Sequence, residues 1–82
     1  MKVVIKEIKS GRFYAQPGAW VAELEMARGF ENSFEAFEHA RLLRLEAVEV
    51  YHASRVPGMD FGVPVSVLQG QRGHGVVALA NL

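Results

Sequence analysis

The sequence feature that most constrains the fold is a helix start signal in the middle of the chain. Asn32 is a favourable N-cap residue, and Glu35, three residues later, completes a capping box. From Ser33 to Leu43 or Arg44, apolar residues recur at the spacing of one helix face. This stripe consists of Ala36, Phe37, Ala40 and Leu43. We predict an amphipathic helix whose apolar stripe faces a sheet.

Within a few residues after the helix, the spacing of the apolar residues changes to every second position. In the segment Ala47 to His52, Val48 and Val50 alternate with Glu49, which is the pattern of a strand with one buried face. A connection this short makes the helix pack on the sheet that holds the extended segment before it, residues 29–31. We therefore predict a β–α–β unit.

The N-terminal residues predict a β-hairpin. Val3 to Ile8 is rich in β-branched residues, residues 9–11 supply a turn, and Arg12 to Gln16 forms the return strand. Pro17-Gly18 is expected to end that strand, because proline cannot donate a hydrogen bond to a sheet. We expect Trp20, just past this turn, to close the open end of the core.

The C-terminal part has weaker patterns. Residues 53–62 are predicted to form a loop, and Val63 to Leu68 an edge strand or extended arm interrupted by Pro64. The glycines of residues 70–75 do not have the spacing of a phosphate-binding loop, so we interpret them as a turn. Val76 to Leu82 is an apolar tail.

Together these signals predict a single α+β domain over residues 1–82, with a core part in residues 1–52 and a loop, edge strand and tail in residues 53–82. Its small sheet comes from the N-terminal β-hairpin plus the β–α–β unit, with one main helix packed on one face and further short C-terminal strands. The predicted core consists of Val4, Phe13, Trp20, Phe30, Ala36, Phe37, Ala40, Leu43, Val48 and Val50.

Composition and motifs argue against several classes of function. The chain has no cysteine, which fits a reducing compartment, and it has no apolar run as long as a membrane span. Glu35 and His39 are one helical turn apart, but two ligands do not make a metal site. No serine lies in a nucleophile elbow. We expect a cytoplasmic, non-catalytic protein with no cofactor, no metal and no membrane contact.

One hypothesis for function is single-stranded nucleic-acid binding, especially RNA, by the hairpin. Nine basic residues balance nine acidic ones over the whole chain, but residues 1–20 carry four basic residues against one acidic residue. Basic side chains interleaved with aromatic rings can contact phosphates and stack on bases. The candidate residues are Lys6, Lys9, Arg12, Tyr14 and Arg28. Phe13 and Tyr14 are adjacent in a strand and point to opposite faces, so at least one of them belongs to the core.

The favoured hypothesis is a protein-interaction module that binds a protein partner or associates as a homo-oligomer. A small sheet covered by one helix leaves an edge exposed, and the C-terminal apolar segments are suited to completing a sheet in a second copy. The residues predicted to form this interaction segment are Val63, Val65, Val67, Val76, Val77 and Leu79.

A further pattern consists of Gly18-x-Trp20, Ala27-x-x-Phe30, Ser33-x-x-Ala36, Leu45 and Val48-x-Val50. It resembles the pattern of a group of small bacterial proteins of unassigned function. The resemblance covers about residues 2–66, and it implies a hairpin and tryptophan before one helix and a strand, in a bacterial or phage-borne cytoplasmic protein. It carries over no catalytic or binding residue.

Overall fold

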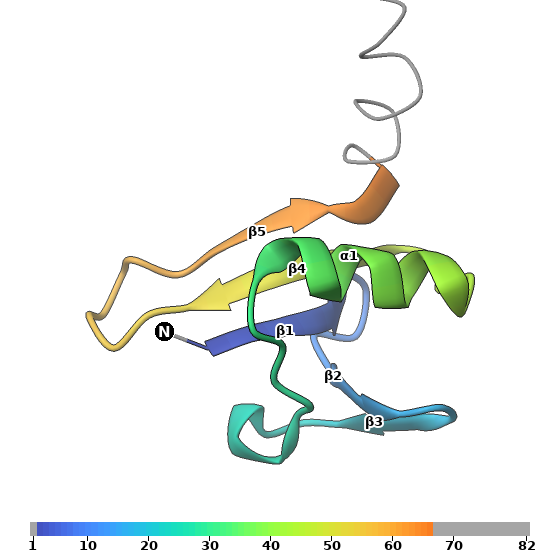
Figure 1. Cartoon of the computed structure of the whole chain (residues 1–82). Coiled ribbons are helices and arrows are strands. Elements are labelled where there is room, and N and C mark those ends of the chain that lie inside the picture. The colour runs from blue at the N-terminus through green and yellow to red at the C-terminus, as the bar shows by residue number, and fades with distance from the viewer. Residues whose placement is uncertain (1, 67–82) are drawn as a thin grey trace, which may run out of the picture.

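A five-stranded antiparallel sheet with one main helix on one face makes up the computed structural model, which describes residues 2–66. The strand order is β3-β2-β1-β4-β5. In Figure 1, α1 lies beside β4 and β1, with β5 above them and β2 and β3 below. The elements are β1 (Lys2–Glu7), β2 (Phe13–Gln16), β3 (Ala19–Val21), the 3-10 turn η1 (Leu24–Met26), α1 (Ser33–Leu42), β4 (Val48–Ala53) and β5 (Phe61–Pro64).

The predicted α+β fold, including the N-terminal hairpin, is confirmed. Before the helix, Phe30 forms an isolated antiparallel bridge with Val3 of β1. After the helix, β4 pairs antiparallel with the other side of β1, where His52 is opposite Val3. Since both segments are antiparallel to β1, they are parallel to each other. The β–α–β unit is therefore split, with β1 inserted between its two extended segments.

The helix begins where the capping signal places it. Asn32 Oδ1 accepts a hydrogen bond of 2.9 Å from the Glu35 backbone N–H, and Glu35 Oε2 accepts one of 3.1 Å from the Glu31 N–H. The helix ends at Leu42, because Leu43 caps it and Arg44 has a left-handed φ of 54°. The predicted stripe is correct for its first three residues, but Leu43, at the cap, is 40% exposed.

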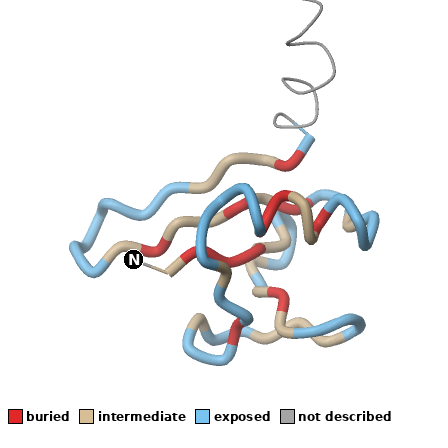
Figure 2. The backbone as a smooth tube through the Cα atoms, viewed as in Figure 1, coloured by how far each residue is buried: buried red, intermediate tan, exposed pale blue. Residues whose placement is uncertain are grey.

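The core lies between α1 and the middle of the sheet (Figure 2). On the helix side, Val3, Ile5, Val48 and Val50 pack with Ala36, Phe37 and Ala40. Trp20 and Phe30 are partly buried against this cluster. Val4 is fully buried but belongs to the opposite face, because successive residues of a strand alternate.

Strand β2 ends at Gln16, directly before Pro17-Gly18, as predicted, but a third strand that was not predicted follows this turn. Pro17-Gly18 forms a turn, with Gly18 at φ 79°, and the chain then pairs back onto β2. Trp20 is therefore a strand residue opposite Tyr14. The proline does not disturb the ladder, because it stands at the turn between two strands, where no ladder donor is required.

Strand β5 lies at the edge of the sheet, as predicted, but it begins at Phe61, two residues earlier than expected, and ends at Pro64, because residues 65 and 66 are helical. Val65, which was predicted to belong to the interaction segment, is instead buried in the core. The predictions for Val67, Val76, Val77 and Leu79 lie outside the described residues. No helix within residues 2–66 is long and apolar enough to cross a membrane.

Candidate functional site

An apolar groove lies between the first turns of α1 and the edge strand β5, and we call it the edge groove. It encloses about 490 Å³, a volume in the range of ligand and peptide sites, which is roughly 300–1,000 Å³. Its walls come from α1, β4 and β5. The lining residues are Ser33, Phe34, Phe37, Val50, His52, Phe61 and Val63.

Two exposed phenylalanines form the rim of the edge groove. Phe34 is 64% exposed, because it stands in the first turn of α1, away from the buried stripe. Phe61 is 50% exposed, because it stands at the start of the edge strand. Phe37, one turn after Phe34, is almost completely buried and contributes to the groove wall. Large apolar rims of this kind mark interaction surfaces more often than single scattered apolar residues do.

His52 supplies the polar feature of the groove. Its ring stacks on Phe61 with the ring centres 4.3 Å apart and the planes 8° apart. The Nδ1 atom is buried and has no hydrogen-bond partner among the described residues. Most buried polar atoms in native structures are hydrogen-bonded. This nitrogen is therefore a polar atom of the groove that a ligand, water or another chain segment can satisfy.

Beside the groove, β5 ends the sheet. Among the described residues it pairs with β4 along one side only, with Val63 opposite Val50 and Gly62 opposite Tyr51. A side chain at position 62 would collide with the carboxylate of Glu49, which lies over Gly62. An unpaired strand edge can accept a further extended segment, and here that edge adjoins an apolar groove.

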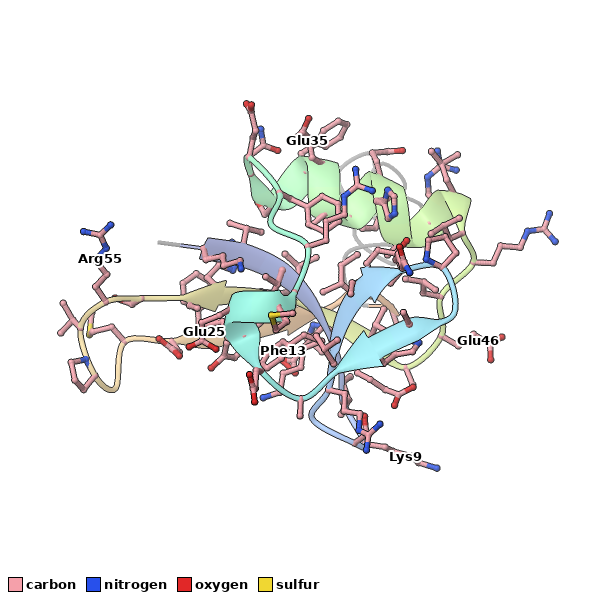
Figure 3. The ribbon with its side chains drawn as sticks, turned by 90° about the horizontal axis from the view of Figure 1, so that it is seen from below. Lys9, Phe13, Glu25, Glu35, Glu46 and Arg55 are labelled. Carbon is pink, nitrogen blue, oxygen red and sulfur yellow. The ribbon has the colours of Figure 1, made fainter. Side chains whose placement is uncertain are left out.

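Only part of the predicted nucleic-acid set comes together in the structure. Lys6 and Phe13 meet on the face turned away from α1, where Tyr51, which the sequence analysis did not select, joins them. Lys6 Nζ is 4.6 Å from the Tyr51 ring centre and 6.0 Å from that of Phe13. The Phe13 and Tyr51 ring centres are 5.9 Å apart. Figure 3 shows Phe13 near the middle of the sheet, seen from below.

Tyr14 corrects the prediction for this set. It is fully buried on the helix side, where its hydroxyl lies 3.0 Å from His39 Nε2. It therefore cannot stack on a base. The half-buried Phe13, which was predicted to be core, lies instead on the face turned away from α1, which we call the open face. Sequence alternation required one ring on each face, but only the pairing register assigns which ring is inside.

The remaining basic residues are separated from each other. Lys9 is exposed in the β1–β2 connection and points away from the sheet in Figure 3, and Arg12 is exposed two residues after the turn. Arg28 lies on the helix side, with its guanidinium carbon 5.2 Å from the Phe30 ring centre. It lines a second, more polar hollow of about 430 Å³ together with His39. The structure thus distributes the basic residues over both faces.

Acidic groups accompany the aromatic pair on the open face. The Tyr51 hydroxyl donates a 2.8 Å hydrogen bond to Asp60 Oδ2, and the Ser54 N–H donates one of 2.7 Å to Asp60 Oδ1. The bond from Ser54, followed by the bond from Tyr51, lowers the pKa of Asp60 below its ordinary value. The hydrogen bond to Asp60 raises the pKa of Tyr51. Asp60 therefore ties the β4–β5 loop to the sheet and offsets the charge of Lys6.

His39 is the titratable group of the helix side. Burial, followed by the nearby positive charge of Arg28, lowers its pKa below 6.5. Its ring packs at 5.2 Å from both Tyr14 and Phe30. These contacts place His39 within the packing between α1 and β2 and favour its neutral form.

Comparisons with protein-family models, with curated proteins and with solved structures find no match to this chain. Within residues 2–66, no group of three or more His, Asp or Glu side chains could hold a metal ion. The edge groove is therefore characterised by its own geometry and chemistry.

Proposed function

We propose that this protein is a non-catalytic protein-interaction module that associates with further copies of itself through the edge groove and strand β5. The observation that carries the proposal is the position of an apolar groove directly beside a strand edge that has no pairing partner within residues 2–66. A cytoplasmic location is part of the same proposal, and the absence of cysteine supports it.

The rim of the groove supports a protein partner over a small molecule. Phe34 and Phe61 project from the groove with half or more of their surface exposed, and a small molecule lying inside would leave much of this area in water. A second protein surface can cover both rings. Fully burying an exposed phenylalanine side chain contributes about 1.5–3 kcal/mol. Covering the exposed half or more of each ring contributes part of this value, and it does so for two rings in each copy.

Single-stranded RNA binding is the second candidate, and the cluster of Lys6, Phe13 and Tyr51 is the observation that favours it. Two ring faces with a nearby ammonium group can hold a base and a phosphate. Asp60 and Glu49 on the same face weaken this candidate, because their charges oppose phosphate binding. If this candidate is correct, Lys6→Glu loses RNA binding at low salt, because it replaces the ammonium group beside the two rings with a carboxylate. An unchanged affinity would remove the candidate.

Sedimentation equilibrium of the full chain over a range of concentrations tests the proposed function. We expect a mass that rises from monomer to dimer with concentration. Phe34→Asp should weaken this association at least about tenfold, because it places a charge on the apolar rim. The same carboxylate lies in the first turn of α1, where it favours the helix, so the variant should stay folded.

Met26→Asp is the matched control. Met26 is 65% exposed, like Phe34, but belongs to η1 rather than to the groove. We expect this variant to associate as the unmodified chain does. A chain that remains monomeric at every concentration, or equal effects of the two substitutions, would contradict the proposed function.

A further inference from the structure

We infer that the edge groove of one copy receives the C-terminal segment Val76–Leu82 of a second copy. This inference rests on the proposed function, because it names the part of the second copy that fills the groove. It differs from direct pairing of two β5 edges, in which the C-terminal segment would play no part.

The composition of the segment matches the groove. None of its seven residues has a charged side chain, and four of them are valine or leucine. The groove is lined by three phenylalanines and two valines, together with Ser33 and His52. An uncharged apolar segment enters such a site without the cost of removing water from a charge, and its burial is favourable in proportion to the apolar area covered.

The polar groups also match, one for one. Asn81 is the single polar side chain of the segment, and His52 Nδ1 is the single buried side-chain nitrogen or oxygen within residues 2–66 that has no hydrogen-bond partner. An amide side chain carries both donors and an acceptor, so it can satisfy the imidazole nitrogen in either tautomer. Stacking on Phe61 holds the His52 ring in place for this contact.

The length of the chain allows the exchange. The described chain reaches Ser66, just past β5, and residues 67–75 separate it from the segment. Ten residue steps span at most about 35 Å, which is more than the length of a four-residue strand. In a dimer with twofold symmetry each copy then donates one segment and receives one, so two equal contacts hold the pair together.

Mixing two defective variants tests the inference in the full chain. Phe34→Asp damages the groove and leaves the segment intact, whereas Leu79→Asp damages the segment and leaves the groove intact. A homodimer of either variant has no intact contact, but a mixed dimer has one. We expect each variant alone to be monomeric at a concentration at which the unmodified chain is dimeric, and an equimolar mixture to regain dimers by sedimentation.

The control and the contrary outcomes separate the two proposals. Gln69→Glu adds a charge outside the segment and should leave association unchanged. If the unmodified chain dimerises but Leu79→Asp does so equally well, or the mixture stays monomeric, the inference is overturned and the proposed function stands. An unmodified chain that is always monomeric overturns both. If in addition Leu79→Asp exposes the groove to a hydrophobic dye, the segment lies in the groove of its own chain.

A double-mutant cycle tests the polar contact itself. His52→Phe keeps the stacking ring and removes the nitrogen, and Asn81→Leu removes the amide. We expect each substitution to weaken dimerisation about three- to tenfold, the range for one hydrogen bond, and the double variant to be no weaker than the worse single one. His52→Asn, whose amide stands near the position of Nδ1, should recover part of the affinity. Fully additive effects of the two substitutions would overturn this pairing.

Discussion

The two faces of the sheet are built from the same strands but differ in chemistry. On the face beneath α1, Ile5, Val50 and Tyr14 are fully buried in an apolar cluster. On the opposite face, the half-buried Lys6, Phe13 and Tyr51 combine a charge with two rings. The difference shows that α1 excludes water from one face of the sheet. On the other face Val4 is also buried, but polar and aromatic side chains beside it remain in partial contact with water.

The largest expected effect is the loss of packing beneath the helix. Ile5→Ala should lower the free energy of unfolding by about 2–5 kcal/mol, because the cavity it leaves is enclosed on all sides. Urea unfolding followed by Trp20 fluorescence measures this change. Ile8→Ala, at a position that is 48% exposed, should change stability by only about 0.5 kcal/mol. Similar losses for both variants would contradict the assignment of Ile5 to an enclosed core.

The neighbouring rings of β2 give a more direct comparison of the two faces. Tyr14→Phe should cost about 1 kcal/mol, because it removes the hydroxyl bonded to His39 Nε2 and leaves that nitrogen without this partner. Phe13→Tyr adds a hydroxyl on the half-exposed face and should be nearly neutral. Chemical denaturation of both variants checks the expectation, and the reverse order of effects would mean that the register of β2 is wrong.

A smaller effect is expected from the charge on the open face. Lys6→Met keeps most of the side-chain length but removes the ammonium group above Tyr51. A cation–π contact at a partly exposed site contributes about 0.5–1 kcal/mol, so thermal unfolding should show a small decrease in stability. Lys9→Met removes an exposed charge that has no ring contact among the described residues, and its stability should not change.

Acid should affect the two faces in different pH windows. His39 has a pKa below 6.5 in the folded protein, so the unfolded chain binds protons first and stability falls as the pH decreases below about 6.5. Asp60 has a pKa below 3.8, so its contribution is present above that value and is lost only as the pH falls below it.

Stability measured against pH distinguishes these two groups. His39→Gln should remove the decrease in stability below about pH 6.5, and Asp60→Asn should remove the decrease below pH 3.8. Each substitution should leave the other decrease unchanged. The effect of Asp60 should be the smaller of the two, because its carboxylate is fully exposed. A substitution that changes both windows would show that the two faces are energetically coupled.

Local signals could be predicted because they depend on residues close together in the chain. The cap at Asn32, the turn between β1 and β2, and the alternation in β4 all formed where the sequence indicated. Strand β3 was not predicted, because three residues after Pro17-Gly18 carry no strand pattern of their own and gain their conformation by pairing with β2. The prediction for Leu43 was wrong because the helix ended one residue earlier.

The candidate site was much less predictable than the fold. Val63 was selected from the sequence, but the groove also requires Phe34 and Phe61, which are 27 positions apart and meet only across α1 and β5. Neither ring has a distinctive sequence pattern. The unpartnered Nδ1 of His52 likewise depends on the stacking of His52 on Phe61 and on burial beside α1.

The sequence by itself determined the helix, its capped start, the alternating strands and the α+β class, because backbone hydrogen bonds and side-chain periodicity are local properties. The tertiary structure alone decided that Tyr14 is inside and Phe13 outside, and that β5 borders an apolar groove. These outcomes depend on strand register and on the position of the helix over the sheet. Both are set by packing between residues distant in the chain, which no local pattern encodes.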